Sequence, residues 1–337
     1  MTPHHASPRI PRTTVVGAGA IGGLIAAALA RAGHDVSVLA RGKTLLAIRE
    51  HGIRIADGDA RESAITVKAS DDAVMLGSQD FVVITLKAQA LPAIAERLQP
   101  LIGERTIIVS AMNGLPWWFL DGTKAPLEGP RIEAVDPAGI VSRVLPGERA
   151  LGCVVHLSAS TDAPGFVRRG RGNRLIVGAA HPDHAAMAQA FASTLTKGGF
   201  DVEAVDNIRN EIWAKLWGNM NMNPLSALTG STADRLLDDP LTHALVLRMM
   251  EEAQEIGTRL GLSTGMSPAD RVAVTRELGA FKTSMLQDVE AGRPLELDPI
   301  LGVFPELGRK LGVPTPFCDA VLGLLRQRAA NSGLYAG

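Results

Sequence analysis

The sequence predicts an α/β fold followed by an all-α domain. Up to about residue 206, short β-branched runs alternate with helical patterns, as they do in a sheet of parallel strands connected by helices. From residue 207 onward, helical patterns continue without a clear strand. The length of 337 residues fits two domains, since compact domains usually have about 100–200 residues each. We therefore expect a first domain over residues 1–206 and a second over residues 207–337.

The predicted strands of the first domain are short apolar runs. Four of them are expected to be buried and parallel, at residues 15–16, 36–39, 81–86 and 106–110. Two further apolar runs follow at residues 151–157 and 175–177, and the Arg- and Gly-rich residues 168–174 between them are typical of a hairpin connection.

The predicted helices of the second domain have recognisable start signals. A side chain that can cap a helix precedes proline, which is well tolerated at the first helical position, in four places. These are Asp239-Pro240, Ser267-Pro268, Asp298-Pro299 and Thr315-Pro316. Ser267 is also followed by Asp270, which resembles a capping box.

Composition excludes several classes of protein. Lys and Arg total 34, Asp and Glu total 35, and the net charge is −1, which argues against a nucleic-acid binder that depends on a strong overall charge. Hydrophobic residues make up 46% of the chain, which argues against disorder as a whole. The first 12 residues are polar and are expected to form a disordered leader.

Neither a membrane segment nor a metal site is indicated. The longest apolar stretch, residues 21–30, is shorter than the ~20 residues needed to cross a bilayer. The two cysteines, Cys153 and Cys318, and the eight scattered histidines fit no metal-ligand spacing. A reducing, cytoplasmic location is therefore expected.

The strongest motif is a glycine-rich turn with the pattern GxGxxG. It follows the first predicted strand and opens an Ala-rich helical run, and its residues are Gly17, Ala18, Gly19, Ala20, Ile21 and Gly22. The first glycine allows a tight turn, the second lets the backbone approach a pyrophosphate, and the third allows close packing of helix and strand. This context predicts a Rossmann-type dinucleotide-binding domain.

The end of the second predicted strand indicates which nicotinamide cofactor is used. NAD enzymes usually have Asp or Glu there to bind the ribose hydroxyls, whereas this chain has Ala40 and Arg41. A guanidinium can pair with the 2′-phosphate of NADP(H), so we expect NADP(H) to be preferred. The alternative is that Arg41 is simply a solvated surface residue.

Two further loops are expected at the same edge of the sheet, because ligands of open α/β sheets bind at the carboxyl ends of strands. Lys87 closes one strand and Asn113 follows the next. Lys87 is a candidate contact for cofactor phosphate or ribose, and Asn113 for ribose or substrate. Each could alternatively be an ordinary loop residue.

A polar stripe marks the beginning of the second domain. Lys215, Asn219 and Asn223 have the spacing i, i+4, i+8 and therefore share one face of a predicted helix. The neighbouring face is apolar, which indicates a largely buried helix. Buried Lys and Asn side chains need polar partners, and a substrate is one of them. The alternative is that the stripe is the solvated side of the helix.

With these motifs in view, the sequence resembles the ketopantoate reductase (2-dehydropantoate 2-reductase) family. The resemblance covers nearly the whole chain. It rests on the motifs GAGAIG (17–22), Arg41, TLKA (85–88), NG (113–114), KLW (215–217) with Asn219, NPL (223–225), SMLQD (284–288) and ELD (296–298).

The resemblance implies an NADP-dependent reduction of a small 2-oxo acid, in the first instance ketopantoate to pantoate in pantothenate biosynthesis. Lys215 matches the family's catalytic lysine, which gives a proton to the substrate oxygen as hydride reaches the carbonyl carbon. Glu296 matches the carboxylate that holds the substrate hydroxyl. Asn113, Asn219, Asn223 and Ser284 match substrate-binding positions, while Arg41, Lys87 and Asn113 match cofactor-side positions.

Other functions are also compatible with the sequence. Trp117 and Trp118 stand where the enzyme of pantothenate synthesis commonly has small residues, so they either reshape the pocket or pack beneath the loop. A related reductase of another small carbonyl compound is therefore an alternative. A non-catalytic NADP(H)-binding redox sensor is another, although it would need neither Lys215 nor Glu296. The apolar faces of the second domain permit a homodimer.

Overall fold

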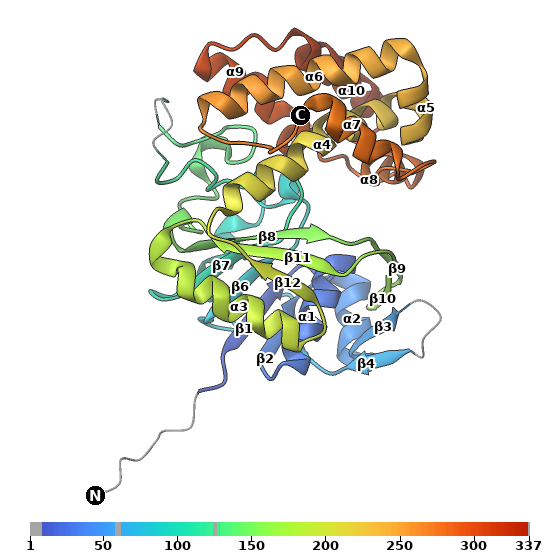
Figure 1. Ribbon diagram of the computed structural model, residues 1–337. Helices are drawn as coiled ribbons and strands as arrows, with labels where there is room; N and C mark the ends of the chain where they lie inside the picture. The colour runs from blue at the N-terminus through green and yellow to red at the C-terminus, as the bar shows by residue number, and fades with distance from the viewer. Residues whose placement is uncertain (1–8, 58–61, 124–126, 128, 336–337) are drawn as a thin grey trace, which may run out of the picture. The chain divides into compact units, whose positions relative to one another are not determined.

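The computed structural model describes residues 9–57, 62–123, 127 and 129–335, and it divides into two compact units (Figure 1). The described residues of the first unit lie within 1–86, 93–112 and 144–206, and those of the second lie within 87–92, 113–143 and 207–337. Residues 87–92 and 113–143 thus group with the helical part of the chain. A division into domains 1–206 and 207–337 stays a prediction.

The first unit is built on a mainly parallel sheet, which confirms the predicted fold class. Among the described residues, the strands follow the spatial order β12 (Asp201–Ala204), β11 (Arg174–Ala179), β8 (Ala150–His156), β7 (Ile107–Ser110), β6 (Phe81–Ile84), β1 (Arg12–Val16), β2 (Asp35–Leu39) and β5 (Lys68–Ser70). All neighbouring pairs are parallel except β8 and β11, which are antiparallel. The four predicted parallel strands are confirmed as β1, β2, β6 and β7.

The register of this sheet aligns the ends of its central strands. Val16, the last residue of β1, lies beside Leu39 of β2 and Ile84 of β6. The chain runs from β1 to β2 on one side and returns to β6 on the other, so the strand order reverses at β1. Ligands of open α/β sheets bind at such a reversal.

A second, smaller sheet was not predicted. It has the order β4 (Ser63–Ile65), β3 (Ile53–Asp57), β10 (Phe166–Arg169) and β9 (Ala159–Ala163). The interpretation of residues 168–174 as a hairpin connection is therefore wrong for Arg168 and Arg169, which belong to β10, and for Arg174, which begins β11. Strand β10 pairs with β3, more than a hundred residues earlier in the chain, and local sequence does not reveal such a partner.

Helices cover the sheets of the first unit. These are α1 (Ala20–Arg31), α2 (Gly42–His51) and α3 (Ala185–Lys197), with short 3₁₀ segments at Ala95–Leu101, Gly147–Arg149 and Pro182–His184. Helix α3 packs against β11 and β12, and α1 packs against α3 and β2 (Figure 1). Residues 1–8 of the predicted leader lie outside the described residues, and Arg12 already belongs to β1.

The second unit is helical, as predicted. Its α-helices are α4 (Ile208–Thr229), α5 (Ala233–Asp238), α6 (Pro240–Arg259), α7 (Pro268–Arg276), α8 (Ser284–Glu290), α9 (Val303–Leu311) and α10 (Pro316–Asn331). Short segments add 3₁₀ turns at Ala88–Ala90 and Pro137–Gly139 and a π-helical turn, η6, at Asp298–Gly302. No helix in the described part of the chain is long and apolar enough to cross a membrane.

Two of the four predicted helix caps are confirmed. The Asp239 carboxylate accepts hydrogen bonds from the N–H groups of Leu241 and Thr242, and Ser267 forms a capping box with Asp270.

At the other two places the predicted side-chain cap is missing, although α10 does begin at Pro316 directly after Thr315, as predicted. Asp298 is the first residue of η6, and its carboxylate binds Arg326 and Tyr335 instead. Thr315 makes no cap bond, because Glu252 of α6 accepts from the first N–H groups of α10. Long-range partners have replaced local caps at both places.

Candidate active site

The glycine-rich turn of the first unit lies at the reversal point of the sheet. Gly17 has φ +100°, a conformation that favours glycine, and its N–H donates to Leu39 O at 3.1 Å. The Thr85 hydroxyl, which follows β6, donates to Gly17 O at 2.7 Å. A Cβ at Gly22 would lie 1.9 Å from Gly17 O, so only glycine permits this approach of helix and turn.

This turn fits the pyrophosphate of a dinucleotide. Gly19 is exposed, and a Cβ added there would meet nothing within 4 Å, so there is open space beside it. Gly19 stands at the N-terminus of α1 and has no side chain to cap the helix. The first amides of α1 and the positive end of its dipole can therefore receive a phosphate.

Two exposed cations stand at the carboxyl end of β2. Arg41 precedes the first residue of α2 and Lys43 is in its first turn, and that turn has no acidic residue. Positive side chains at the N-terminus of a helix oppose its dipole, and a bound anion would relieve this unfavourable interaction. The arrangement can receive an anion, and a contact with the 2′-phosphate stays a prediction.

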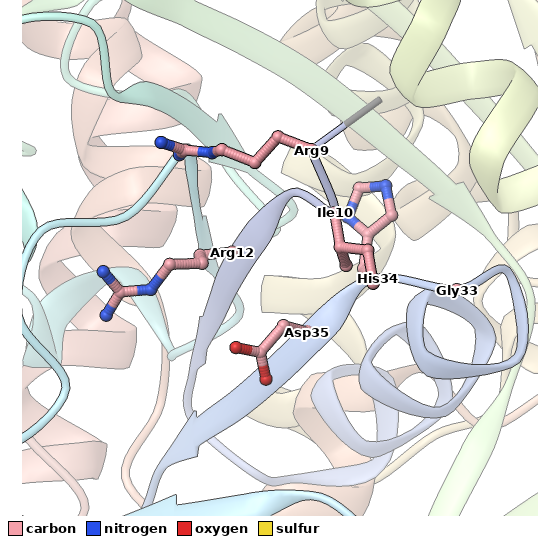
Figure 2. Close-up of a pocket in the computed structure, with 6 residues that line it drawn as sticks. All are labelled: Arg9, Ile10, Arg12, Gly33, His34 and Asp35. Carbon is pink, nitrogen blue, oxygen red and sulfur yellow. The ribbon is translucent and has the colours of Figure 1, made fainter. Parts of the chain in front are cut away.

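A separate hollow lies at the opposite ends of β1 and β2. It is open and shallow, with a volume of about 640 Å³, and is lined by Arg9, Ile10, Arg12, Gly33, His34 and Asp35 (Figure 2). These residues lie at the amino ends of the two strands, whereas the glycine turn and Arg41 follow their carboxyl ends. The hollow is therefore not the predicted cofactor site.

The polar stripe in the second unit lies on α4, a helix of 22 residues. Ile212, Leu216 and Met220 are buried, and Lys215 and Asn219 are half-buried, as expected for a helix with an apolar face beside a polar one. The side chain of Asn207 caps the helix by accepting from Asn210 N at 3.3 Å.

The stripe is joined to a predicted residue of a distant loop. Lys215 Nζ donates to Asn113 Oδ1 at 3.0 Å, across 102 positions of sequence. Within the described residues, the side-chain amides of Asn219 and Asn223 have no hydrogen-bond partner, and neither is sealed from solvent. Both amides are therefore available to a ligand beside the Lys215 ammonium.

The loop that carries Asn113 is fixed by η6. Leu115 N donates to Pro299 O at 2.9 Å, and Gly114 has φ +81°. A Cβ at Gly114 would lie 2.6 Å from Pro299 O, so glycine is needed for this close approach. The contact links the Asn113 loop to the segment that immediately follows Glu296.

Glu296 is a buried carboxyl group with 7% of its surface exposed. Its Oε1 accepts from the N–H of Ala88 at 3.2 Å. Burial raises the pKa of the Glu296 carboxyl above its usual value, while the Ala88 N–H and the charges of Lys87 and Lys215 act in the opposite direction. Glu296 is therefore within electrostatic reach of Lys215.

Lys87 lies in an ion pair that the sequence did not suggest. Its Nζ is 2.5 Å from Asp288 Oδ2 and donates to Pro294 O at 2.8 Å. The other oxygen of the buried Asp288 accepts from Arg293 Nε at 2.7 Å. A cofactor contact by Lys87 stays a prediction, because its ammonium is bound within the second unit here.

Asp288 itself was missed as a member of the site. The available signal was that Asp288 follows Ser284 by four residues, the spacing of side chains on one face of a helix. Ser284 is exposed as the first residue of α8, whereas its neighbour Thr283 caps that helix by accepting from Leu286 N at 3.2 Å.

The two unusual tryptophans pack in the interior of the second unit. Trp117 is 3% exposed and Trp118 is fully buried. The guanidinium of Arg209 lies over the Trp118 ring at 5.6 Å and donates to the backbone oxygens of Phe119 and Asp121. Of the two roles considered for these residues, the structure supports packing beneath the loop.

No group of three His, Cys, Asp or Glu in the described part of the chain could hold a metal ion. Both cysteines are buried, and burial raises the pKa of the Cys318 thiol far above its usual value.

Comparison with known proteins identifies the family. The family described as ketopantoate reductase PanE/ApbA matches residues 13–182, and its C-terminal counterpart matches residues 207–329. A 2-dehydropantoate 2-reductase of Mesorhizobium japonicum is 43% identical over 96% of this chain and 100% of its own length.

Solved structures agree with this assignment. A candidate ketopantoate reductase from Ralstonia solanacearum is 46% identical, with a TM-score of 0.90 over 97% of this chain and 100% of its own. A 2-dehydropantoate 2-reductase from Geobacter metallireducens is 27% identical, with a TM-score of 0.80 over 94% and 99% of the two chains. The chain therefore belongs to the ketopantoate reductase family and is an oxidoreductase.

Proposed function

We propose that this reductase uses NADP(H) to reduce a small 2-oxo acid to the 2-hydroxy acid, with 2-dehydropantoate as the first candidate substrate. The observation that carries the proposal is the hydrogen bond between Lys215 and Asn113, on a helix face that also presents Asn219 and Asn223. The name of the Mesorhizobium japonicum relative supports this choice of substrate.

On the cofactor side, Gly17–Gly22 receive the pyrophosphate at the N-terminus of α1, and Arg41 pairs with the 2′-phosphate. NADPH, when bound, supplies the hydride that adds to the carbonyl carbon and is thereby oxidised to NADP⁺. Lys43 adds a second positive charge near the proposed phosphate site. Lys87 and Asn113 are further proposed cofactor contacts.

Lys215 is the proposed general acid. Negative charge develops on the carbonyl oxygen as the carbon is reduced, and an ammonium within hydrogen-bond reach stabilises that charge. Lys215 then gives a proton from Nζ to this oxygen and recovers one from solvent. Asn113 helps to orient the ammonium without neutralising it, because an amide oxygen carries no net charge.

The remaining polar groups are proposed to hold the substrate. Asn219, Asn223 and Ser284 can hydrogen-bond the carboxylate without cancelling the charge of Lys215. Glu296 accepts a hydrogen bond from the substrate hydroxyl. Because Trp117 and Trp118 are interior residues, their bulk does not by itself argue for a different substrate.

An NADPH-oxidation assay over a panel of 2-oxo acids tests this function. We expect 2-dehydropantoate to give the highest kcat/KM. A higher value for another 2-oxo acid or small carbonyl would identify a related reductase. Tight NADPH binding without turnover of any panel member would favour the redox sensor and contradict the proposal.

The assembly can be tested separately. We propose a homodimer through apolar faces of the second unit, with neither nucleic acid nor membrane as a partner. Light scattering of the purified protein measures its mass, and a monomeric mass at assay concentration would contradict the dimer.

A further inference from the structure

Arg271 is a half-buried cation of α7 without an acidic partner. Its Nη1 donates to the Thr275 hydroxyl at 2.9 Å, and no carboxylate of the described residues lies within ion-pair distance of it. Burial lowers the pKa of the Arg271 guanidinium, and no neighbouring acid offsets this effect. A cation removed from water without a counter-ion is costly, so an anionic ligand would stabilise this arrangement.

Two other partly buried arginines of the same unit have a carboxylate or backbone partner, although Nε of Arg326 has no acceptor among the described residues. Arg326 pairs with Asp298, and Arg209 donates to two backbone oxygens. By contrast, Nε and Nη2 of Arg271 have no protein acceptor, and neither atom is sealed from solvent. A ligand can therefore reach this edge of the guanidinium.

The guanidinium lies against the backbone of α4 at Gly218. A Cβ at Gly218 would lie 2.1 Å from Nη2 and 2.7 Å from Cζ of Arg271, so any larger residue would displace the guanidinium. Glycine inside a helix is less favourable than alanine. The absence of a side chain at Gly218 is what allows the guanidinium to approach the helix so closely.

Gly218 also fixes the position of Arg271 relative to the proposed acid. It follows Lys215 by three residues and directly precedes Asn219, and residues three apart are neighbours on a helix surface. The Arg271 guanidinium thus lies against α4 one turn along the helix from Lys215. The carboxylate of a 2-oxo acid is bonded directly to its carbonyl carbon, so a substrate held at Lys215 carries its negative charge nearby.

We propose that Arg271 binds the carboxylate of the substrate and selects acids over uncharged carbonyl compounds. The inference rests on the proposed function and adds the charged contact that Asn219, Asn223 and Ser284 do not provide. A planar guanidinium matches a carboxylate and can donate two hydrogen bonds to it. Thr275 limits the rotation of the guanidinium by accepting a hydrogen bond from its Nη1.

The test compares a 2-oxo acid that the parent enzyme reduces with the methyl ester of the same acid. In Arg271→Met we expect the acid-to-ester ratio of kcat/KM to fall by about 10–100-fold, the range for loss of a charged hydrogen bond. NADPH affinity and turnover of the ester should stay within twofold. Arg309→Met, at an exposed position of α9, is the matched control and should leave the ratio unchanged.

Gly218→Ala separates binding from a purely structural role. The added methyl group displaces the guanidinium, so the ratio should fall as in Arg271→Met, although alanine favours the helix. Gly323→Ala on α10, where a Cβ would meet nothing within 4 Å, is its control.

The outcomes distinguish this inference from the proposed function. A parent enzyme that reduces no 2-oxo acid overturns both. A parent enzyme that reduces the acid, with an unchanged acid-to-ester ratio in Arg271→Met and Gly218→Ala, overturns the role of Arg271 alone. Equal losses for acid and ester also overturn it, because they indicate a structural defect.

Discussion

The glycine turn of the first unit uses backbone groups, whereas the Lys215 site of the second unit uses side chains. The turn presents backbone amides, and it depends on the absence of side chains at Gly17, Gly19 and Gly22. The Lys215 site presents side chains from three distant segments, through Lys215, Asn113 and Glu296. We therefore expect the turn to be impaired by atoms added at its glycines, and the Lys215 site to be impaired by removal of its functional groups.

The largest expected effect is that of Lys215→Ala. Loss of a general acid typically lowers kcat by about 10²–10⁴-fold. The Kd of NADPH should change less than twofold, because the proposed cofactor contacts lie mainly in the glycine turn and at Arg41. Steady-state kinetics and a fluorescence titration measure the two quantities.

Lys197→Ala, at the exposed end of α3, is the matched control and should behave as the parent enzyme. Near-normal turnover of Lys215→Ala would reject the assignment of the acid. A large loss of NADPH affinity in Lys215→Ala would show that Lys215 also contributes to cofactor binding, so that the two regions do not act as separate sites.

The second prediction contrasts two glycines of the turn. A methyl group at Gly22 would lie 1.9 Å from Gly17 O and 2.4 Å from Thr85 Oγ1. Gly22→Ala should therefore lower the free energy of unfolding by about 1–3 kcal/mol, as overpacking does, and weaken NADPH binding. Denaturant unfolding and the NADPH titration measure both effects.

Gly19→Ala is the matched variant, because its methyl group would meet nothing within 4 Å. It should change the free energy of unfolding by no more than about 0.5 kcal/mol, as at ordinary surface positions. NADPH affinity should still fall, because the methyl group occupies the proposed pyrophosphate space. Equal affinity of Gly19→Ala and the parent enzyme would argue against the position of that site.

The same contrast explains how much the sequence could predict. The turn is local: one strand, three glycines and one helix occupy about twenty residues, and each residue type has its own steric reason. Strand β1, the turn and α1 were therefore predictable. So were the caps at Asp239 and Ser267, since each cap binds amides within three residues.

Long-range pairing was not predictable in this way. The sequence indicated Lys215 and Asn113 as separate candidates, but the bond between them spans 102 residues. The ion pair of Lys87 with Asp288 spans 201 residues. The sequence predicted Asp298 as a helix cap, but its carboxylate instead accepts hydrogen bonds from Arg326 and Tyr335, which follow it by 28 and 37 residues. Such partners depend on tertiary packing, which local patterns do not encode.

Arg41→Ala tests whether the first unit also depends on a side chain. Loss of a charged hydrogen bond to the 2′-phosphate should lower kcat/KM for NADPH by about 10–100-fold and leave that for NADH unchanged. Arg105→Ala, also exposed in the first unit, is the control. Equal kcat/KM values for NADPH and NADH, unchanged by Arg41→Ala, would remove the proposed preference.

The smallest expected effect, and the one with the most specific signature, is that of Glu296→Gln. Glutamine keeps an oxygen that can accept from Ala88 N, but it has no charge. The KM for the hydroxylated substrate should therefore rise by roughly tenfold, which is near the lower end of the range for charged hydrogen bonds. The kcat should change less than the KM. An unchanged KM would exclude the proposed contact with the substrate hydroxyl.

The pH dependence of stability gives an independent test of the same carboxyl group. Because burial raises the pKa of Glu296 in the folded protein, the folded state binds more protons than the unfolded chain between the usual and the raised pKa. The free energy of unfolding therefore decreases as pH rises through this interval, and Glu296→Gln lacks this decrease. The Tm of Glu296→Gln minus that of the parent enzyme should thus increase from acidic to neutral pH. The corresponding difference for Glu277→Gln, at an exposed position, should show no such trend. A constant difference would mean that Glu296 titrates as it does in the unfolded chain, and that its site is more hydrated than its burial indicates.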